Sequence, residues 1–460
     1  MEAPVILVPS LIQLLQPFSR HMTRPTFASF ATLVSGWVFA TRHNITGSLR
    51  AGHHAGRAAT PKHFSAYHRV FAAARWSLDA VGLTLLGLIV TLAIACDSPV
   101  FLIIDDTLCP KSGSTMFGVD SHYDAANTGR KRSNAKQSLK RRGHCWVILG
   151  VVIPLPFAAG RYCCLPLLFR LYMNRKGAGR HHKSYRSRPD LARQMLTMAC
   201  NHLPKRRFHA LVDNAFAGQD TLRQLPANCD LTARWQMNAR LCQPAPTRRP
   251  SGRRGPLPKR GPRLPSPRQM LEERCPRLDI ELYGKSHKLR VASCLACLYT
   301  VPERLLRMVA IEPLSAAGKP RPKRRAFYYS TATCADVIAI LQWYALRWTI
   351  EVTIHDAKQQ LGFGQPQGWT EPAVQRTAPT LMLLYSVVVL WFAQEGHRSY
   401  RRPVWPWYRN KTAISFADML CTLRMCMLRQ HLKQNLSTPV KTEGSRNPLR
   451  IIVRLARLAA

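Results

Sequence analysis

The sequence has few acidic residues: 24 Asp and Glu stand against 67 Lys and Arg among 460 residues, and the formal net charge is +43. A chain with this charge repels itself unless a polyanion neutralises it, and nucleic acid is the natural polyanion. A basic membrane-surface protein is the alternative. Such proteins concentrate their charge on one amphipathic helix or beside a membrane span, whereas here the charge is spread along the chain. The composition therefore favours a nucleic-acid-binding protein.

The apolar segment 81–96 is too short for a typical membrane span. It has 16 residues without a charge, and a spanning helix needs about 20. Asp97-Ser98-Pro99 follows it at once, and a second apolar run after that ends in paired acids. We therefore expect a buried helix that leads into a core strand, and a membrane span is the less favoured alternative.

The 14 cysteines show no clear disulfide or zinc pattern. The one C-x-x-C motif, Cys294 with Cys297, has neither a second Cys pair nor a His-x-x-x-His partner. We interpret it as structural, with a zinc site as the less favoured alternative. The N-terminus carries Glu2 and no basic stretch, so we expect no secretory signal and a cytoplasmic location.

Residues 344–358 are the most informative segment, because their polar side chains recur at helical spacing. On a helix, four of them lie on one face, within an arc of roughly 60°: Tyr344, Arg347, Glu351 and Lys358. A carboxylate flanked by a phenol, a guanidinium and an ammonium can hold a metal ion while its neighbours bind phosphate oxygens. A solvated helix face with i,i+4 charge pairs explains any single residue. The spacing of all four together favours a phosphoryl-transfer surface.

The pattern Y-x2-R-x3-E-x6-K, followed by Leu361-Gly362-Phe363-Gly364, resembles the signature of DDE transposases of the insertion-sequence type. The resemblance covers roughly residues 100–395. It implies an α/β catalytic core with an RNase H-like fold, interrupted by a β-rich insertion. It also implies that Glu351 is the third catalytic carboxylate, so that two Asp residues are required upstream, each at the end of a strand.

Two apolar runs end in Asp and are expected to be buried strands. Residues 100–104 are followed by Asp105 and Asp106, and residues 208–212 are followed by Asp213. A helix cap or a turn is the alternative role for such an Asp. The resemblance singles out Asp106, which precedes Thr, as the first metal ligand, with Asp105 as the second candidate. It assigns the second catalytic carboxylate to Asp213.

The resemblance implies a metal-dependent reaction on DNA. Asp106, Asp213 and Glu351 would hold two divalent ions, Mg²⁺ with Mn²⁺ as a substitute. The protein would cleave the ends of an insertion element and transfer the 3′-hydroxyl ends into target DNA, as a homodimer in a synaptic complex. Two alternatives stay open: a domesticated, non-catalytic DNA-binding protein, and a metal-dependent nuclease without strand transfer.

Several basic and aromatic residues are candidates for contacts with DNA. By the resemblance, Arg347 and Lys358 bind phosphates and Tyr344 hydrogen-bonds the backbone near the cut. Residues 130–142 are strongly basic and contain no acid, so we expect them along DNA phosphates, with a solvated loop as the alternative. The candidates in that stretch are Arg130, Lys131, Arg132, Lys140 and Arg141. In related transposases an aromatic residue of the insertion stacks on an unpaired base, and Trp235 is a weak candidate for this role.

The sequence suggests five parts. Residues 1–97 are expected to form a helical N-terminal domain, either for binding element ends or for packing, and residues 98–213 the first part of the core. Residues 214–331 would be the insertion, with a Pro/Arg-rich segment at 243–268 and several β-strands. Residues 332–395 would hold the signature helix, starting at 331–333, and a helix that completes the core. Residues 396–460 would be a basic, aromatic and helical tail.

Overall fold

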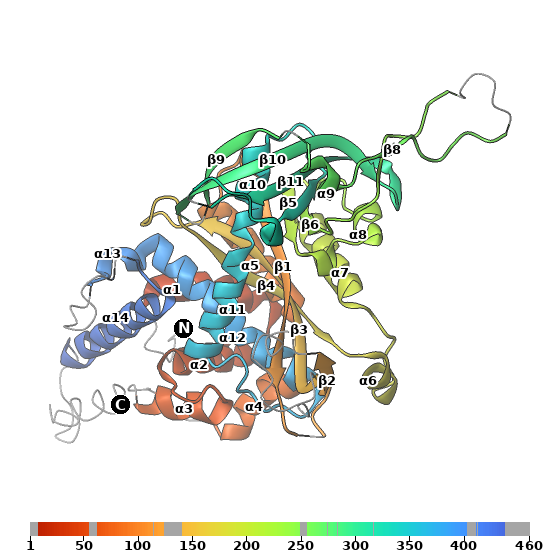
Figure 1. The fold of residues 1–460 in the computed structure, drawn as a ribbon. Helices are drawn as coiled ribbons and strands as arrows, with labels where there is room; N and C mark the ends of the chain where they lie inside the picture. The colour runs from red at the N-terminus through yellow and green to blue at the C-terminus, as the bar shows by residue number, and fades with distance from the viewer. Residues whose placement is uncertain are drawn as a thin grey trace, which may run out of the picture.

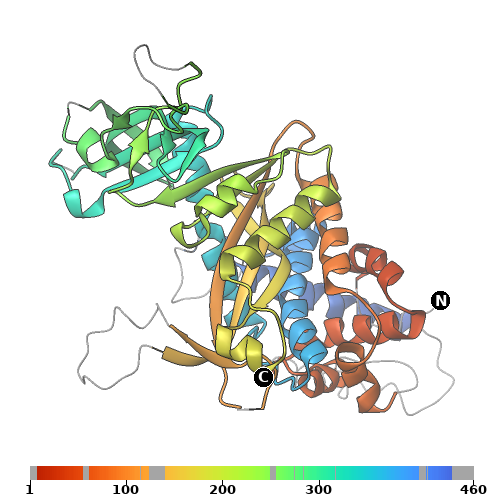
Figure 2. The same ribbon diagram turned by 90° about the vertical axis from the view of Figure 1, so that its right-hand side faces the viewer.

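The structure is a computed structural model, and it describes residues 8–54, 62–113, 115–123, 140–248, 255–273, 275–282, 284–315, 317–402, 411 and 413–437. A mixed β-sheet runs through the protein, as Figure 1 shows. Helices pack around one part of the sheet, and a strand-rich part projects beyond them, which is clearest in Figure 2. The projecting part lies within the predicted insertion.

The helix-covered part of the sheet has its neighbouring strands in the order β4-β3-β1-β5-β6. The strands are β1 (Val100–Pro110), β3 (Lys140–Pro154), β4 (Tyr162–Tyr172), β5 (Phe208–Val212) and β6 (Cys229–Trp235), with the short β2 (Asp120–Tyr123) at the start of β3. β1 pairs antiparallel with β3 and parallel with β5. β3 and β4 pair antiparallel and form a hairpin.

Helices α7 (Arg188–His202) and α11 (Trp348–Gln360) lie on opposite faces of this sheet. Successive side chains of a strand point to opposite faces, and Asp106 contacts Arg188 of α7 whereas Asp105 contacts Arg347, which precedes α11. Helix α12 (Glu371–Trp391) packs on β4 on the side of α11. The hydroxyls of Thr353 in α11 and Ser386 in α12 both donate to backbone carbonyls of β4.

The N-terminal residues are helical, as predicted, and share their hydrophobic core with the sheet. The helices are α1 (Pro9–Leu15), α2 (Arg24–Phe39), α3 (Ile45–His54), α4 (Phe64–Ala72) and α5 (Leu78–Ala93). Three of them, α1, α4 and α5, contact α12, and α2 contacts α14 (Phe416–Ser437). Because α12 is buried along nearly its whole length, the N-terminal helices form part of its covering.

In the described part of the chain, two helical stretches are long and apolar enough to cross a membrane by length and composition, Val337–Gln360 and Glu371–Ser399. The apolar window of the second is 94% buried inside the protein, as expected for the central helix of a core. Helix α5 is buried on one side and leads to β1, in agreement with the prediction for residues 81–96.

The strand-rich part extends the core sheet through β12 (Ala326–Ser330), which pairs with β6. It continues with β11 (Val301–Pro313) and β10 (Lys285–Leu298), then β7 (Leu241–Cys242) and β8 (Arg263–Leu264), with β9 (Arg277–Leu282) also on β10. β7 to β12 all lie within residues 214–331, for which several β-strands are predicted. Strand β6 also falls in the segment predicted as insertion, but it pairs parallel with β5. The sheet of the core therefore continues beyond Asp213.

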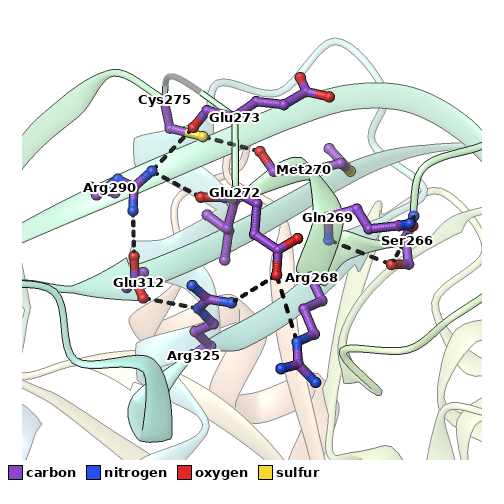
Figure 3. A network of polar contacts seen from close by, with 11 residues as sticks. Ser266, Arg268, Gln269, Met270, Glu272, Glu273, Cys275, Arg290, Glu312 and Arg325 are labelled. Atoms are coloured by element: carbon purple, nitrogen blue, oxygen red, sulfur yellow. Dashed lines mark hydrogen bonds and ion pairs between the residues drawn. The ribbon is translucent and has the colours of Figure 1, made fainter.

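A buried ion network fixes a loop onto the strand-rich part. The carboxylate of Glu312 is fully buried and accepts from Arg290 at 2.7 Å and Arg325 at 2.9 Å, as Figure 3 shows. Arg290 also donates to the carbonyls of Leu271 and Glu273, just after the short helix α9 (Pro267–Met270). The network thus ties the chain that follows the Pro/Arg-rich segment to β10 and β11.

Candidate active site

The candidate active site is built on β1, where the two neighbouring acids have different surroundings. Asp105 and Asp106 pair with Ile148 and Val147 of β3 in the middle of the sheet. The backbone of both residues is therefore fixed by the ladder, and the alternation of the strand sends their side chains to opposite faces. Each carboxylate then meets a different arginine.

Arg347 brings the carboxylates of Asp105 and Glu351 together. Its guanidinium donates to Asp105 Oδ2 at 3.3 Å and also forms an ion pair with Glu351, one helical turn later. The Arg347 side chain is 14% exposed, so this pairing takes place in a largely desolvated position. A carboxylate of β1 and the signature carboxylate of α11 thus face the same point.

Burial raises the pKa of Asp105 to about 7. The loss of solvent is the largest cause, and the positive charge of Arg347 opposes it. The negative charges of Asp106 and Glu351 raise this pKa further. The protein alone does not fully offset the cost of burying the ionised Asp105 carboxylate. A buried carboxyl with such a raised pKa is typical of a functional site.

Asp106 is directed away from this point. Its Oδ2 accepts from Arg188 Nη1 at 2.8 Å on the α7 face, and the thiol of Cys145 lies 3.6 Å from the same oxygen. The family resemblance favours Asp106 as the first metal ligand, with Asp105 as the second candidate. The structure brings Asp105, and not Asp106, to Glu351.

Asp213 follows β5 directly, beside β1. The pairing of Ile104 with Val212 places Asp213 next to Asp105 in the register of the two parallel strands. The carboxylate accepts from the backbone N–H of Asn214 and caps a short 3-10 turn. Burial raises the pKa of the Tyr344 phenol, the positive charge of Arg347 opposes this, and the negative charge of Asp213 adds to the increase.

The signature segment forms two helices that meet at Arg347. Helix α10 (Val337–Leu346) begins later than the predicted start at 331–333, because the Asp336 side chain caps it by accepting from the N–H of Ile338. Arg347 itself ends α10 and precedes α11. The junction between α10 and α11 places the Arg347 guanidinium against β1.

The other two signature residues also face the sheet. Lys358 Nζ donates to Thr107 Oγ1 at 2.7 Å and to the carbonyl of Leu108 at 3.1 Å, which fastens α11 to β1. Tyr344 is 8% exposed, and its ring lies 4.7 Å from that of Tyr328 in β12. The four signature residues thus come from two helices and their junction, and not from the one helix that the sequence predicts.

The donor set suits a hard divalent cation. Asp105 and Glu351 provide carboxylate oxygens, the ligands that Mg²⁺ prefers, and both already contact one positive group, Arg347. Within the described part of the chain, no group of three or more His, Cys, Asp or Glu side chains is close enough to hold a metal ion. Two of the three proposed ligands are thus brought together by Arg347, and Asp213 stands at the adjacent strand end.

The other residues predicted to contact DNA lie in different parts of the chain. Lys140 and Arg141 begin β3 and are exposed, at the place where β3 pairs with β2. Arg130, Lys131 and Arg132 lie outside the described residues. Trp235 ends β6, is half-buried and meets the ring of Tyr329 edge-on at 6.2 Å.

Comparison with known protein families gives a match over residues 17–287 to the DDE superfamily endonuclease model. This match covers more than half of the chain. The chain belongs to the DDE superfamily endonucleases. No curated protein matched it. The family indicates an enzyme that acts on DNA, and DDE superfamily nucleases generally use divalent metal ions. The matched region includes Asp105 and Asp213, and it ends before Glu351.

Proposed function

We propose that this DDE endonuclease is a DNA transposase whose catalytic carboxylates are Asp105, Asp213 and Glu351. This choice is supported by one observation: Asp105 and Glu351 both contact Arg347. Asp105 and Arg347 are 242 positions apart in the sequence. Asp213 completes the set from the next parallel strand. This proposal replaces Asp106 of the sequence analysis with its neighbour.

Divalent ions held by these carboxylates supply charge stabilisation at the reacting phosphate and activation of the attacking oxygen. The protein contributes fixed positions. Asp105 is held by its pairing with Ile148 of β3, directly after the residues of β1 that pair with β5, and Glu351 is held because Lys358 fastens α11 to β1. The planar guanidinium of Arg347 offers further N–H donors to a phosphate oxygen. Tyr344, whose ring packs against Tyr328, positions α10.

The proposed reaction has two steps, and each is a displacement at a DNA phosphodiester. In the first, water attacks a phosphodiester at the element end, and the bond from phosphorus to the 3′-oxygen breaks. The products are a 3′-hydroxyl and a 5′-phosphate. In the second, that 3′-hydroxyl attacks a phosphodiester of the target DNA, forms a new phosphodiester and releases a target 3′-hydroxyl.

The test uses labelled duplexes with the ends of the encoding element, Mg²⁺ or Mn²⁺, and a plasmid target. We expect cleavage of the intact ends, and joining of pre-cleaved ends only when they carry a 3′-hydroxyl and not a 3′-dideoxy terminus. Glu351→Gln should abolish both steps and retain DNA binding. Cleavage without joining would instead indicate a nuclease, and binding without cleavage in either metal a non-catalytic DNA-binding protein.

A further inference from the structure

A second basic surface lies outside the residues considered so far. Residues 174–187, here called the basic arm, connect β4 to α7 and include helix α6 (Arg175–Arg180). No Asp or Glu occurs between Asn174 and Pro189. The arm exposes five cationic side chains: Arg175, Lys176, Arg180, Lys183 and Arg186.

The arm is anchored to the rest of the protein by hydrogen bonds. The Asn174 side chain caps α6 by accepting from Gly177 N–H, and Asp120 Oδ2 accepts from Asn174 N–H at 3.1 Å. A Cβ at Gly177 would come within 2.2 Å of Asp120, so α6 lies directly on this carboxylate. His181 Nε2 accepts from Gly118 N–H at 3.1 Å. These contacts give the exposed charges defined positions.

An aromatic contact joins the two ends of the arm. The Arg175 guanidinium lies 4.4 Å from the centre of the Tyr185 ring, a cation–π distance. Tyr185 remains 36% exposed, so the contact lies at the protein surface. Arg175 is thereby held at the surface without a carboxylate.

Most of the charge on the arm is not neutralised. Arg180 lies 3.8 Å from Asp120, and Lys183 pairs with Glu371 at 2.9 Å. Among the described residues, Lys176 and Arg186 have no carboxylate within ion-pair distance. A polyanion would remove the repulsion within this surface.

The arm leads to the catalytic strand β1, on the face of the sheet opposite Asp105 and Glu351. Arg186 is two residues from Arg188, and two residues span at most about 7 Å. Arg188 contacts Asp106 at 2.8 Å, and Asp106 is the neighbour of Asp105. In Figure 1, α6 lies beside β2, at the opposite end of the sheet from the strand-rich part. The exposed cations thus extend outward from the catalytic strand.

We propose that the basic arm binds the phosphate backbone of duplex DNA beyond the cleaved phosphate, through Lys176, Arg186 and their neighbours. The inference rests on the proposed function, because it takes DNA at Asp105 and Glu351 as given. Backbone contacts of this kind bind without regard to sequence and position the duplex. The Asp106–Arg188 pair then serves as the link that fixes the arm to the catalytic strand.

The test measures DNA binding of the full-length protein by fluorescence anisotropy, without metal, over a range of salt concentrations. The probe is a labelled duplex of unrelated sequence. For Lys176→Ala/Arg186→Ala, the slope of log affinity against log salt should decrease by about 2, because each lost phosphate contact removes about 0.9. The control is Arg161→Ala/Lys205→Ala, which removes two exposed cations at the other ends of the β3–β4 hairpin and of α7.

The control should leave the slope nearly unchanged. An equal slope in the arm variant, the control and the unmodified protein would overturn the inference, whatever the protein catalyses. The cleavage assay reports separately on the proposed function. If the intact protein never cleaves DNA but the arm variant lowers the slope, the proposed function fails and the DNA contact stands.

Discussion

Asp105 and Asp106 are neighbours in β1, yet their carboxylates contact arginines on opposite faces of the sheet. Asp105 meets Arg347 at the start of α11, and Asp106 meets Arg188 at the start of α7. One strand therefore serves two purposes. It presents one carboxylate to Glu351 and uses the next to hold the helix that follows the basic arm.

Asp105→Asn should stabilise the protein at neutral pH. Folding raises the pKa of Asp105 from 3.8 to about 7. The folded protein binds the Asp105 proton more tightly than the unfolded chain does. The free energy of unfolding therefore falls as the pH rises through this interval, by up to about 4 kcal/mol. The variant should raise the Tm at pH 8 by several degrees and have little effect near pH 4. Asp106→Asn, which loses its ion pair with Arg188, is the matched control and should not raise the Tm.

Metal affinity should depend on pH through the same group. Below about pH 7 the metal-free protein carries a proton on Asp105, and a cation must displace it. We expect the affinity for Mn²⁺, measured by calorimetry, to fall by up to about tenfold for each pH unit below 7. A flat profile between pH 6 and 8 would show that the Asp105 carboxyl does not contribute to metal binding. In Asp105→Asn the remaining affinity should be weaker and less dependent on pH.

Buried histidines should destabilise the fold in acid. Burial lowers the pKa of His144 to about 4, and its Nε2 pairs with the carbonyl of Phe117. The unfolded chain takes up this proton from about pH 6.5 downward. The free energy of unfolding should therefore fall between pH 6.5 and 4, by up to about 3 kcal/mol for this residue. Urea unfolding of His144→Gln should show a smaller pH dependence, whereas that of the exposed control His68→Gln should match the unmodified protein.

Removal of the Glu312 charge should loosen the strand-rich part. Glu312→Gln leaves Arg290 and Arg325 without their buried carboxylate, and breaking such a pair costs about 3–5 kcal/mol. We expect a lower Tm and faster proteolysis at the chain around α9. Glu303→Gln removes an exposed partner of Arg223 and should cost less than about 1 kcal/mol. Equal Tm values for the two variants would show that the network is not stabilising.

Much of the fold follows from the sequence because apolar runs that end in acids have few structural solutions. The strand before Asp213 appears where the pattern predicts it. The strand that starts at Val100 does so too, but it continues through Asp105 and Asp106 to Pro110 and does not end at the acids. The helical spacing of the signature likewise predicts the face that meets β1. These features depend on the sequence of residues within short segments of the chain.

The choice between Asp105 and Asp106 depends on tertiary packing. Alternation along a strand shows that the two side chains diverge, but only the docking of α11 decides which one meets Glu351. The burial of Tyr344 similarly depends on Tyr328, which arrives from the strand-rich part. Strand β6 was assigned to the insertion because its sequence lies beyond Asp213, and only its pairing with β5 identifies it as part of the core sheet.

Other features carried signals that were not used. Ser187-Arg-Pro-Asp190 is a capping box with Pro at the first turn, and it places Arg188 at a helix start. Only the fold shows that this helix start lies against Asp106. The basic arm was visible as a charged loop, but its anchoring by Asp120 and Gly118 depends on contacts distant in sequence.

The most direct test of the account compares the metal-dependent cleavage of a labelled element-end duplex by Asp105→Asn and by Asp106→Asn, both confirmed to bind the duplex. The account predicts that Asp105→Asn abolishes cleavage, as Glu351→Gln does, whereas Asp106→Asn keeps measurable cleavage with weakened positioning of the DNA. Loss of cleavage in Asp106→Asn together with full activity in Asp105→Asn would contradict the assignment of the catalytic carboxylate.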